Sequence, residues 1–213
     1  MIKEFIKRNS KKLIITSLVA ATVVASVGGY IYTKQNEFKN KVVRFHVLAN
    51  SDSNVDQTVK LKVKDEVIKY VQPLLKESKS IEQSKDILNS NKDKIIAIAN
   101  KELSDNGQTY TASAKLSKFD FPVKSYGDIV FPSGEYEAFR IVLGNGEGKN
   151  WWCVMFPPLC FIDVKNAVAD KEMQSELSKV LTDEELEKVN AKKENTNVKF
   201  KFKAVEVLKG LMN

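Results

Sequence analysis

The apolar residues of the chain are concentrated in one uninterrupted run near the N-terminus. Residues 13–32, LIITSLVAATVVASVGGYIY, contain no charged side chain, and about 20 apolar residues form a helix long enough to cross the hydrocarbon layer of a membrane. Residues 1–12 carry five basic side chains and one glutamate. Because basic flanks remain in the cytoplasm, we expect a basic cytoplasmic leader at 1–12, a transmembrane or signal segment at 13–32, and export of the rest.

The apolar segment is compatible with two fates, a permanent anchor and a cleaved signal. Its length favours an anchor, since the apolar part of a signal peptide usually has about 7–15 residues. The sequence Val23-Val24-Ala25 also provides a small residue after which a signal peptidase can cut. The sequence leaves both open.

The exported part begins with a polar linker at 33–41, followed by a strand and two helical stretches. Residues 42–49 are rich in β-branched and aromatic side chains, which predicts a strand. Valines at every fourth position predict a helix that begins after Ser53. A second helical pattern runs from Ser80 to about residue 105, with a break at Asn89-Ser90-Asn91.

The hydrophobic period then changes from helical to two. Residues 110–116 alternate between apolar and polar side chains, as in a half-buried strand. Short turns separate the strand candidates that follow, so we expect antiparallel hairpins. The C-terminal part is expected to be helical around 175–189, to alternate again at 198–202 and to end in a helical pattern. The other strand candidates are residues 129–131, 136–143 and 151–156.

This order of elements predicts an α+β fold, with a mainly antiparallel sheet packed by helices in one domain at 42–213. Beyond residue 34 the chain has 28 basic and 26 acidic side chains. Such a balanced charge gives no basis for a nucleic-acid partner. We also expect no cofactor, no metal and no small-molecule substrate.

His46 is the only histidine of the chain. In an alternating strand it shares a face with Arg44 and Leu48. Catalysis or metal binding would require partner residues that the sequence does not identify. A structural or recognition role is therefore favoured over a catalytic one.

Cys153 and Cys160 are the only cysteines. In an exported protein such a pair is a disulfide candidate, and its spacing does not match the C-x-x-C redox motif. Buried free thiols, or a nucleophilic pair of one cysteine with His46, remain open alternatives.

A glycine-rich segment at 144–150 precedes two adjacent tryptophans. It is not a phosphate-binding loop, because Asn150 takes the Ser/Thr position and a strand, not a helix, follows. We interpret it as a hairpin turn. Trp151 and Trp152 should point to opposite faces of the strand, so that one is a candidate partner-binding anchor and the other a core residue.

The polar residues after the first strand exceed those needed to cap one helix, since Ser53 alone would suffice. We therefore expect residues 50–60 and 151–160 to form a single recognition surface, with polar side chains from the first segment and an apolar anchor from the second. The alternative is that residues 50–52 only shape the turn and that both tryptophans are core residues.

Two long stretches carry a family resemblance. RFHVLANSDSNVDQTVKLKVKDEV at 44–67 and FPSGEYEAFRIVLGNGEGKNWWCVMFPPLCFID at 131–163 together resemble the stage II sporulation protein R family of endospore-forming bacteria. The candidate recognition residues that match the family's pattern are Arg44, His46, Asn50, Ser51, Asp52, Asp56, Gln57, Lys60, Tyr136, Arg140, Trp151 and Trp152.

The resemblance implies a signalling role without catalysis. Members of this family are made in the forespore and sent into the space between the two membranes. There they activate a membrane-embedded aspartic protease of the mother cell, stage II sporulation protein GA, which then removes the pro-sequence of sigma factor E. The resemblance thus implies an extracytoplasmic location, at the forespore membrane or in the intermembrane space, with a cytoplasmic N-terminus if the chain stays anchored.

Two other functions compete with this one. The chain could be an exported hydrolase with a Cys/His pair, or a cell-wall-binding module. A contact between His46 and a cysteine would favour the hydrolase, whereas an exposed apolar patch without such a pair would favour a protein ligand.

Overall fold

The computed structural model describes residues 14–26, 28–29, 37–162 and 167–190, with the side chains of 167–170 excepted. The chain divides into two units, residues 1–41 and 42–213, and each is described by itself. The expected leader at 1–12, the alternation at 198–202 and the helical pattern after it lie outside the described residues.

In the first unit, residues 14–26 and 28–29 are helical. The expected linker contains a short 3-10 helix, η1 (Glu37–Lys41). Across the described ranges, we find no helix with both the length and the apolar character that a membrane crossing requires.

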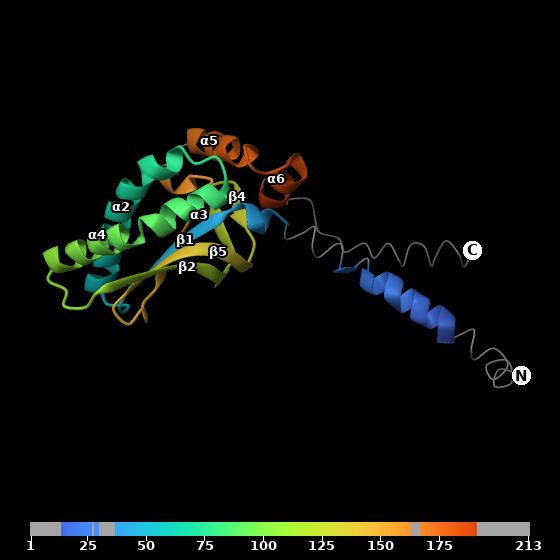
Figure 1. Cartoon of the computed structure of the whole chain (residues 1–213), viewed down its shortest axis with the longest axis horizontal. Coiled ribbons are helices and arrows are strands. Elements are labelled where there is room, and N and C mark those ends of the chain that lie inside the picture. The colour runs from blue at the N-terminus through green and yellow to red at the C-terminus, as the bar shows by residue number, and fades with distance from the viewer. Residues whose placement is uncertain (1–13, 27, 30–36, 163–166, 191–213) are drawn as a thin grey trace, which may run out of the picture. The chain divides into compact units, whose positions relative to one another are not determined.

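The second unit has the expected α+β architecture, built on a mixed four-stranded sheet (Figure 1). Its order is β2 (Ala112–Phe121), β5 (Gly134–Leu143), β1 (Val43–Leu48) and β6 (Asn150–Phe156). β1 runs parallel to β5 and antiparallel to β6, and β2 is antiparallel to β5. The first strand of the domain is therefore one of its two central strands.

The predicted hairpin between residues 136–143 and 151–156 is wrong. β1 lies between β5 and β6, so the segment at 144–149 crosses the end of β1 and is not a hairpin turn. The hairpin that does form joins β3 (Lys124–Tyr126) to β4 (Ile129–Phe131) in a separate two-stranded sheet. β2 also extends beyond its predicted end, to Phe121.

Three helices cover one face of the sheet: α2 (Asn54–Lys76), α3 (Ile81–Ser90) and α4 (Lys92–Asp105). The Ser53 hydroxyl caps α2 by accepting a hydrogen bond from the Asp56 amide, and Ser80 caps α3 in the same way. The expected break near Asn89–Asn91 separates α3 from α4, with Asn91 between the two helices.

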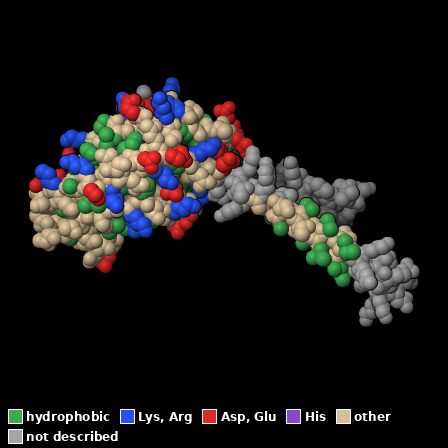
Figure 2. All heavy atoms as spheres, viewed as in Figure 1, with side chains coloured by type: hydrophobic (Ala, Val, Ile, Leu, Met, Phe, Trp, Pro, Cys, Tyr) green, Lys and Arg blue, Asp and Glu red, His purple; other side chains and the backbone are tan. Residues whose placement is uncertain are grey.

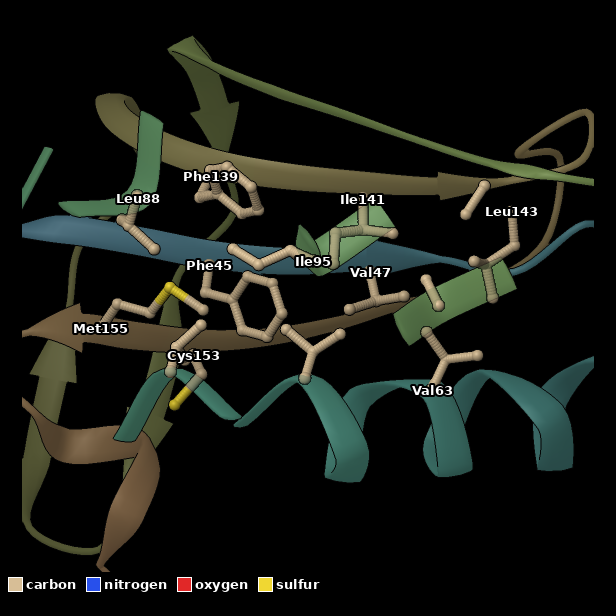
Figure 3. Packing of buried hydrophobic residues seen from close by; sticks show 14 of the residues in the cluster. Phe45, Val47, Val63, Leu88, Ile95, Phe139, Ile141, Leu143, Cys153 and Met155 are labelled. Carbon is tan, nitrogen blue, oxygen red and sulfur yellow. The ribbon is translucent and has the colours of Figure 1, made fainter. Parts of the chain in front are cut away.

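The main core lies between these helices and the sheet (Figure 3). Phe45 and Val47 of β1 point toward the helices together with Phe139 and Ile141 of β5. Val63 of α2, Leu88 of α3 and Ile95 of α4 meet them from the other side. All seven side chains are essentially inaccessible to solvent, which makes this layer the main source of hydrophobic stabilisation.

Residues 43–47 of β1 are buried on both faces of the sheet. The remaining described elements are η2 (Leu159–Phe161), α5 (Ala167–Ser178) and α6 (Asp183–Val189). Asn190, which follows α6, forms an isolated bridge with Ile129 of β4. The predicted helix at 175–189 is therefore two helices, which separate around Val180 and Leu181.

Candidate functional site

The polar residues at the C-terminal end of β1 converge on one buried carboxylate. Asp56, which is 6% exposed, accepts hydrogen bonds from the Ser51 hydroxyl at 2.5 Å, the Asn50 amide at 3.0 Å and the Tyr110 hydroxyl at 2.6 Å. Burial raises the pKa of Asp56, but the hydrogen bonds from Ser51, Tyr110, Asn50 and Ser53 outweigh this, so its pKa lies below the usual range. The charge is thus held inside the fold by local donors.

The same segment binds the backbone of the loop at 144–149. Asn50 Oδ1 accepts from the Asn145 amide at 3.0 Å, and Asp52 Oδ1 accepts from the Lys149 amide at 2.7 Å. The Lys60 ammonium donates to the Lys149 carbonyl at 2.9 Å and to Gln57 Oε1 at 2.6 Å. These contacts link the start of α2 to the loop between β5 and β6.

The close approach of the loop explains one of its glycines. The Gly148 amide donates to the Ala49 carbonyl at 2.9 Å, and a Cβ on Gly148 would lie 2.2 Å from the Ser51 carbonyl oxygen. Only glycine permits this approach. We call the polar side chains that hold the loop the loop clamp: Asn50, Ser51, Asp52, Asp56, Gln57 and Lys60.

The two tryptophans lie on opposite faces of β6 and are both half-buried. Trp151 packs against the helix-side core, edge-on to Phe45 at 5.8 Å between ring centroids, with the Lys64 ammonium 5.0 Å from its ring. Trp152 stacks on His46 on the other face. Of the two, Trp151 lies on the side of α2, and the chain just before it, at Lys149, is bound by Asp52 and Lys60, so the two predicted segments adjoin there. Their joint role in recognition stays a prediction.

The other face of the sheet carries a different group of residues. Strand alternation and register place them together on the side away from α2–α4. We call this side of the sheet the basic face; its members range from fully buried, as Arg44, to exposed, as Lys115. Its members are Arg44, His46 and Leu48 of β1, Ser113, Lys115, Ser117, Phe119 and Phe121 of β2, Tyr136, Ala138, Arg140 and Val142 of β5, and Asn150, Trp152 and Val154 of β6.

Arg44 is a fully buried cation in the basic face. Its Nε donates to the Cys153 carbonyl and its Nη2 to the Tyr126 hydroxyl, both at 3.2 Å. The guanidinium carbon lies 4.5 Å from the ring centre of Phe121 and 4.8 Å from that of Phe131, so aromatic faces take the place of a counterion. Burial lowers the pKa of Arg44, and the Tyr126 and Tyr136 side chains oppose this.

His46 lies beside Arg44 in an aromatic enclosure. Its ring stacks on Trp152 at 5.0 Å and lies 5.0 Å from Phe121 and 5.4 Å from Phe119. It is 4% exposed, and neither ring nitrogen has a hydrogen-bond partner among the described residues. Burial, and then the charges of Arg140 and Arg44, lower the pKa of His46 to about 3.

Two more predicted residues complete the basic face. The Tyr136 hydroxyl donates to the Pro132 carbonyl at 2.7 Å, and burial raises its pKa to about 12, against the opposing effect of Arg44. Arg140 is half-buried, with its guanidinium 4.1 Å from the centre of the Phe119 ring. Arg140 is the register partner of both His46 and Lys115.

Cys153 and Cys160 are joined in a disulfide, with their Cα atoms 5.7 Å apart. Cys153 belongs to the helix-side core, whereas His46 points to the basic face, so the sheet separates the two side chains. The Cys/His pair of the hydrolase alternative is not formed in this structure. In the described part of the chain, no three His, Cys, Asp or Glu side chains gather as a metal site would require.

The structure adds residues that the sequence did not single out. Tyr110 belongs to the Asp56 network across 54 positions of sequence, and Phe119 and Phe121 enclose His46. The alternation of Phe119 and Phe121 on a strand longer than predicted was the available signal. For Tyr110 no local signal exists, because its partner is set by how the segment between α4 and β2 approaches the start of α2.

Comparison with known proteins places the chain in a family. The family model described as stage II sporulation protein R matches residues 39–166, which include both the loop clamp and the basic face. The stage II sporulation protein R of Bacillus subtilis (strain 168) is 44% identical over 156 residues, which cover 73% of this chain and 70% of the relative. No solved structure matches the fold. The family is named for a stage of sporulation and not for an enzymatic activity, and the extent of both matches shows that the chain belongs to the stage II sporulation protein R family.

Proposed function

We propose that this protein is an exported signal of sporulation that activates the membrane-embedded aspartic protease stage II sporulation protein GA, and thereby the processing of pro-sigma-E in the mother cell. The observation that carries the proposal is family membership, since the match spans residues 39–166 and hence the whole sheet and α2–α4. The chain acts as a protein ligand and leaves the cleavage to its partner.

Two features of the chain support export. The Cys153–Cys160 disulfide suits an oxidising compartment outside the cytoplasm. The basic residues 1–12 and the uncharged run at 13–32 have the order of a leader that directs the following domain across a membrane. On this proposal, residues 13–32 either hold the protein in the forespore membrane or are removed as it enters the intermembrane space.

The chemistry of the described side chains supports a ligand over a hydrolase. A nucleophilic cysteine requires a thiolate and a base within hydrogen-bond reach. Here both thiols are joined to each other, and His46 lies on the opposite face of the sheet. The buried carboxylate of Asp56 is hydrogen-bonded to neighbouring donors, as a residue that stabilises the fold would be.

The test is co-expression of this protein with the protease and pro-sigma-E in a host that does not sporulate. We expect shortening of pro-sigma-E only when the full chain and the protease are both present. A protease with its catalytic aspartate replaced serves as the control, because it must abolish shortening if the protease makes the cut.

A second comparison isolates export. A chain that lacks residues 1–32 should leave pro-sigma-E uncut, and the same domain behind an unrelated signal peptide should restore the cut. Full activity of the leaderless chain, or shortening that does not require the protease, would overturn the proposal.

A further inference from the structure

We propose that the basic face binds an acidic segment of a partner protein, with a carboxylate of that segment bound between Arg140 and His46 and its neighbouring residues lying against Trp152 and Phe119. This deepens the proposed function, on which the identity of the partner rests. The acidic chemistry of the ligand follows from the residues of the domain.

The charges of the basic face are all of one sign. The ionisable side chains of the basic face other than Tyr136 are three cations, Arg44, Lys115 and Arg140, together with His46, which is neutral because its pKa is lowered to about 3. None of them forms an ion pair within the described part of the chain, although ion pairs occur elsewhere in the domain, as between Lys85 and Glu137. On the side of the molecule visible in Figure 2, basic and acidic side chains are interspersed. An uncompensated cluster of one sign is complementary to a ligand of the other.

Polar atoms of two buried side chains in the basic face lack hydrogen bonds within the described residues. Both nitrogens of His46, and Nη1 of Arg44, are buried without a partner among the described residues. A buried polar group left unpaired destabilises a fold, so such a group requires an explanation. A neutral imidazole has one N–H to donate, and a carboxylate supplies the acceptor that the domain does not.

One edge of the basic face is accessible to solvent. Lys115 is exposed, and Arg140, Phe119 and Trp152 are half-buried, so this row of the sheet forms the open border of the enclosure around His46. The Lys124 ammonium lies 5.5 Å from the Trp152 ring and adds a cation at the same border. Half-exposed aromatic rings beside a guanidinium group are typical anchors of protein recognition.

The balanced charge of the chain beyond residue 34 favours a peptide ligand over a membrane or a nucleic acid. Those polyanions are bound through broad basic surfaces with several phosphate contacts, whereas the chain beyond residue 34 has 28 basic and 26 acidic side chains. The chain's own C-terminal segment does not suit the site, because residues 191–213 carry six lysines and two glutamates. A partner protein with a local acidic stretch has the complementary charge and suits the site.

The test uses the full chain in detergent and peptides that cover the extracytoplasmic segments of the protease. Each acidic peptide is paired with a copy in which Asp and Glu are replaced by Asn and Gln. We expect an acidic peptide to bind and its neutral copy to bind at least about tenfold more weakly, as for the loss of a charge-assisted hydrogen bond. Arg140→Gln should weaken binding by a similar factor.

Lys118→Gln is the matched control. Lys118 lies three residues after Lys115 on β2, points to the other face of the sheet, and is paired with Glu135. Lys115→Gln should weaken binding, and Lys118→Gln should not. As the only histidine of the chain, His46 gives unique ring signals in NMR, and its pKa should rise when the peptide binds because a carboxylate favours the imidazolium.

The outcomes separate the two proposals. Loss of pro-sigma-E shortening in Arg140→Gln and Lys115→Gln, with Lys118→Gln active, supports the basic face. Normal shortening in both variants overturns the acidic-ligand inference and leaves the proposed function intact. If the wild-type chain never triggers shortening, the peptide titration still decides the inference. Binding that depends on Arg140 but goes to phosphatidylglycerol vesicles, to nucleic acid or to a second copy of the chain, and not to acidic peptides, overturns it.

Discussion

The loop clamp and the basic face flank the same strand, yet they treat buried polar groups in opposite ways. In the loop clamp, the Asp56 carboxylate accepts from three side chains, and Asp52 and Lys60 bind the backbone of the loop at 144–149. In the basic face, His46 has no hydrogen-bond partner in the described structure, and Arg44 rests on aromatic rings with one nitrogen unpaired.

On our proposal, this difference separates polar residues that stabilise the fold from those that bind a partner. Hydrogen bonds within a domain account for buried polar groups and require no ligand. The sequence suggested that the surplus of polar residues after β1 belongs to a recognition surface. The structure shows that these residues form internal contacts, and it leaves the unpaired donors on the opposite face of the sheet.

The largest effect is expected from Asp56→Ala. This change leaves the Asn50, Ser51 and Tyr110 donors without their acceptor in a buried site, and we expect the free energy of unfolding to fall by about 4 kcal/mol. Chemical denaturation measures it. Tyr110→Phe, which removes one of the three bonds, should cost roughly 1 kcal/mol. If Asp56→Ala lowered the free energy of unfolding by less than Tyr110→Phe does, the loop clamp would not be a stabilising network.

The second-largest loss of stability is expected from removal of the disulfide. A disulfide between Cys153 and Cys160, which are seven positions apart in sequence, restricts the unfolded chain, and the chain-entropy relation gives about 2.5 kcal/mol. The double variant Cys153→Ala/Cys160→Ala should therefore unfold at a lower temperature than the wild type. Reducing agent should shift the wild type in the same direction and leave the double variant unchanged. A reductant-sensitive double variant would contradict this.

A pH dependence should distinguish the basic face from the clamp. Burial, Arg140 and Arg44 lower the pKa of His46 from 6.5 to about 3, so between these values the unfolded chain binds a proton that the folded chain does not. The free energy of unfolding is therefore highest above the unfolded pKa. It decreases as the pH is lowered, by about 2 kcal/mol between about pH 6.5 and 4.5. The slope should disappear in His46→Gln. An unchanged slope in that variant would place the titrating group elsewhere.

The smallest effect is expected from Asp52→Ala. Its carboxylate accepts from the Lys149 amide and the Gln57 side chain at an exposed position, so the expected loss is about 1 kcal/mol, smaller than for the buried Asp56. Signalling should be retained at a temperature where the variant is folded. If signalling is lost while stability is unchanged, the clamp contacts the partner, and the contrast between the two faces fails.

Local patterns predicted the elements near β1 well. The β-branched run at 42–49 became β1, and the valines at every fourth position place the buried stripe of α2 against the sheet. Alternation also predicted that Arg44 and His46 share a face. These predictions depend on side-chain direction within one element, which the sequence period determines.

The pairing of distant strands was not predictable in this way. Consecutive strands usually pair, which led to a predicted hairpin between 136–143 and 151–156, whereas β1 lies between them. The role of the glycine-rich loop follows from this insertion, because the loop must cross the end of β1 and approach Ser51. The enclosure of His46 likewise depends on Phe121, which is 75 positions away in sequence and beyond the predicted end of its strand.

Site-specific photo-crosslinking to the protease most directly tests whether the basic face, and not the other face of the sheet, binds the partner. A photo-crosslinking residue replaces either Lys115 on the basic face or Lys118 on the opposite face of the same strand, in the full chain co-expressed with stage II sporulation protein GA. We expect a crosslinked species from position 115 and none from position 118. A crosslink from 118 alone, or none from 115 in a preparation that still triggers pro-sigma-E shortening, would contradict the assignment of recognition to the basic face.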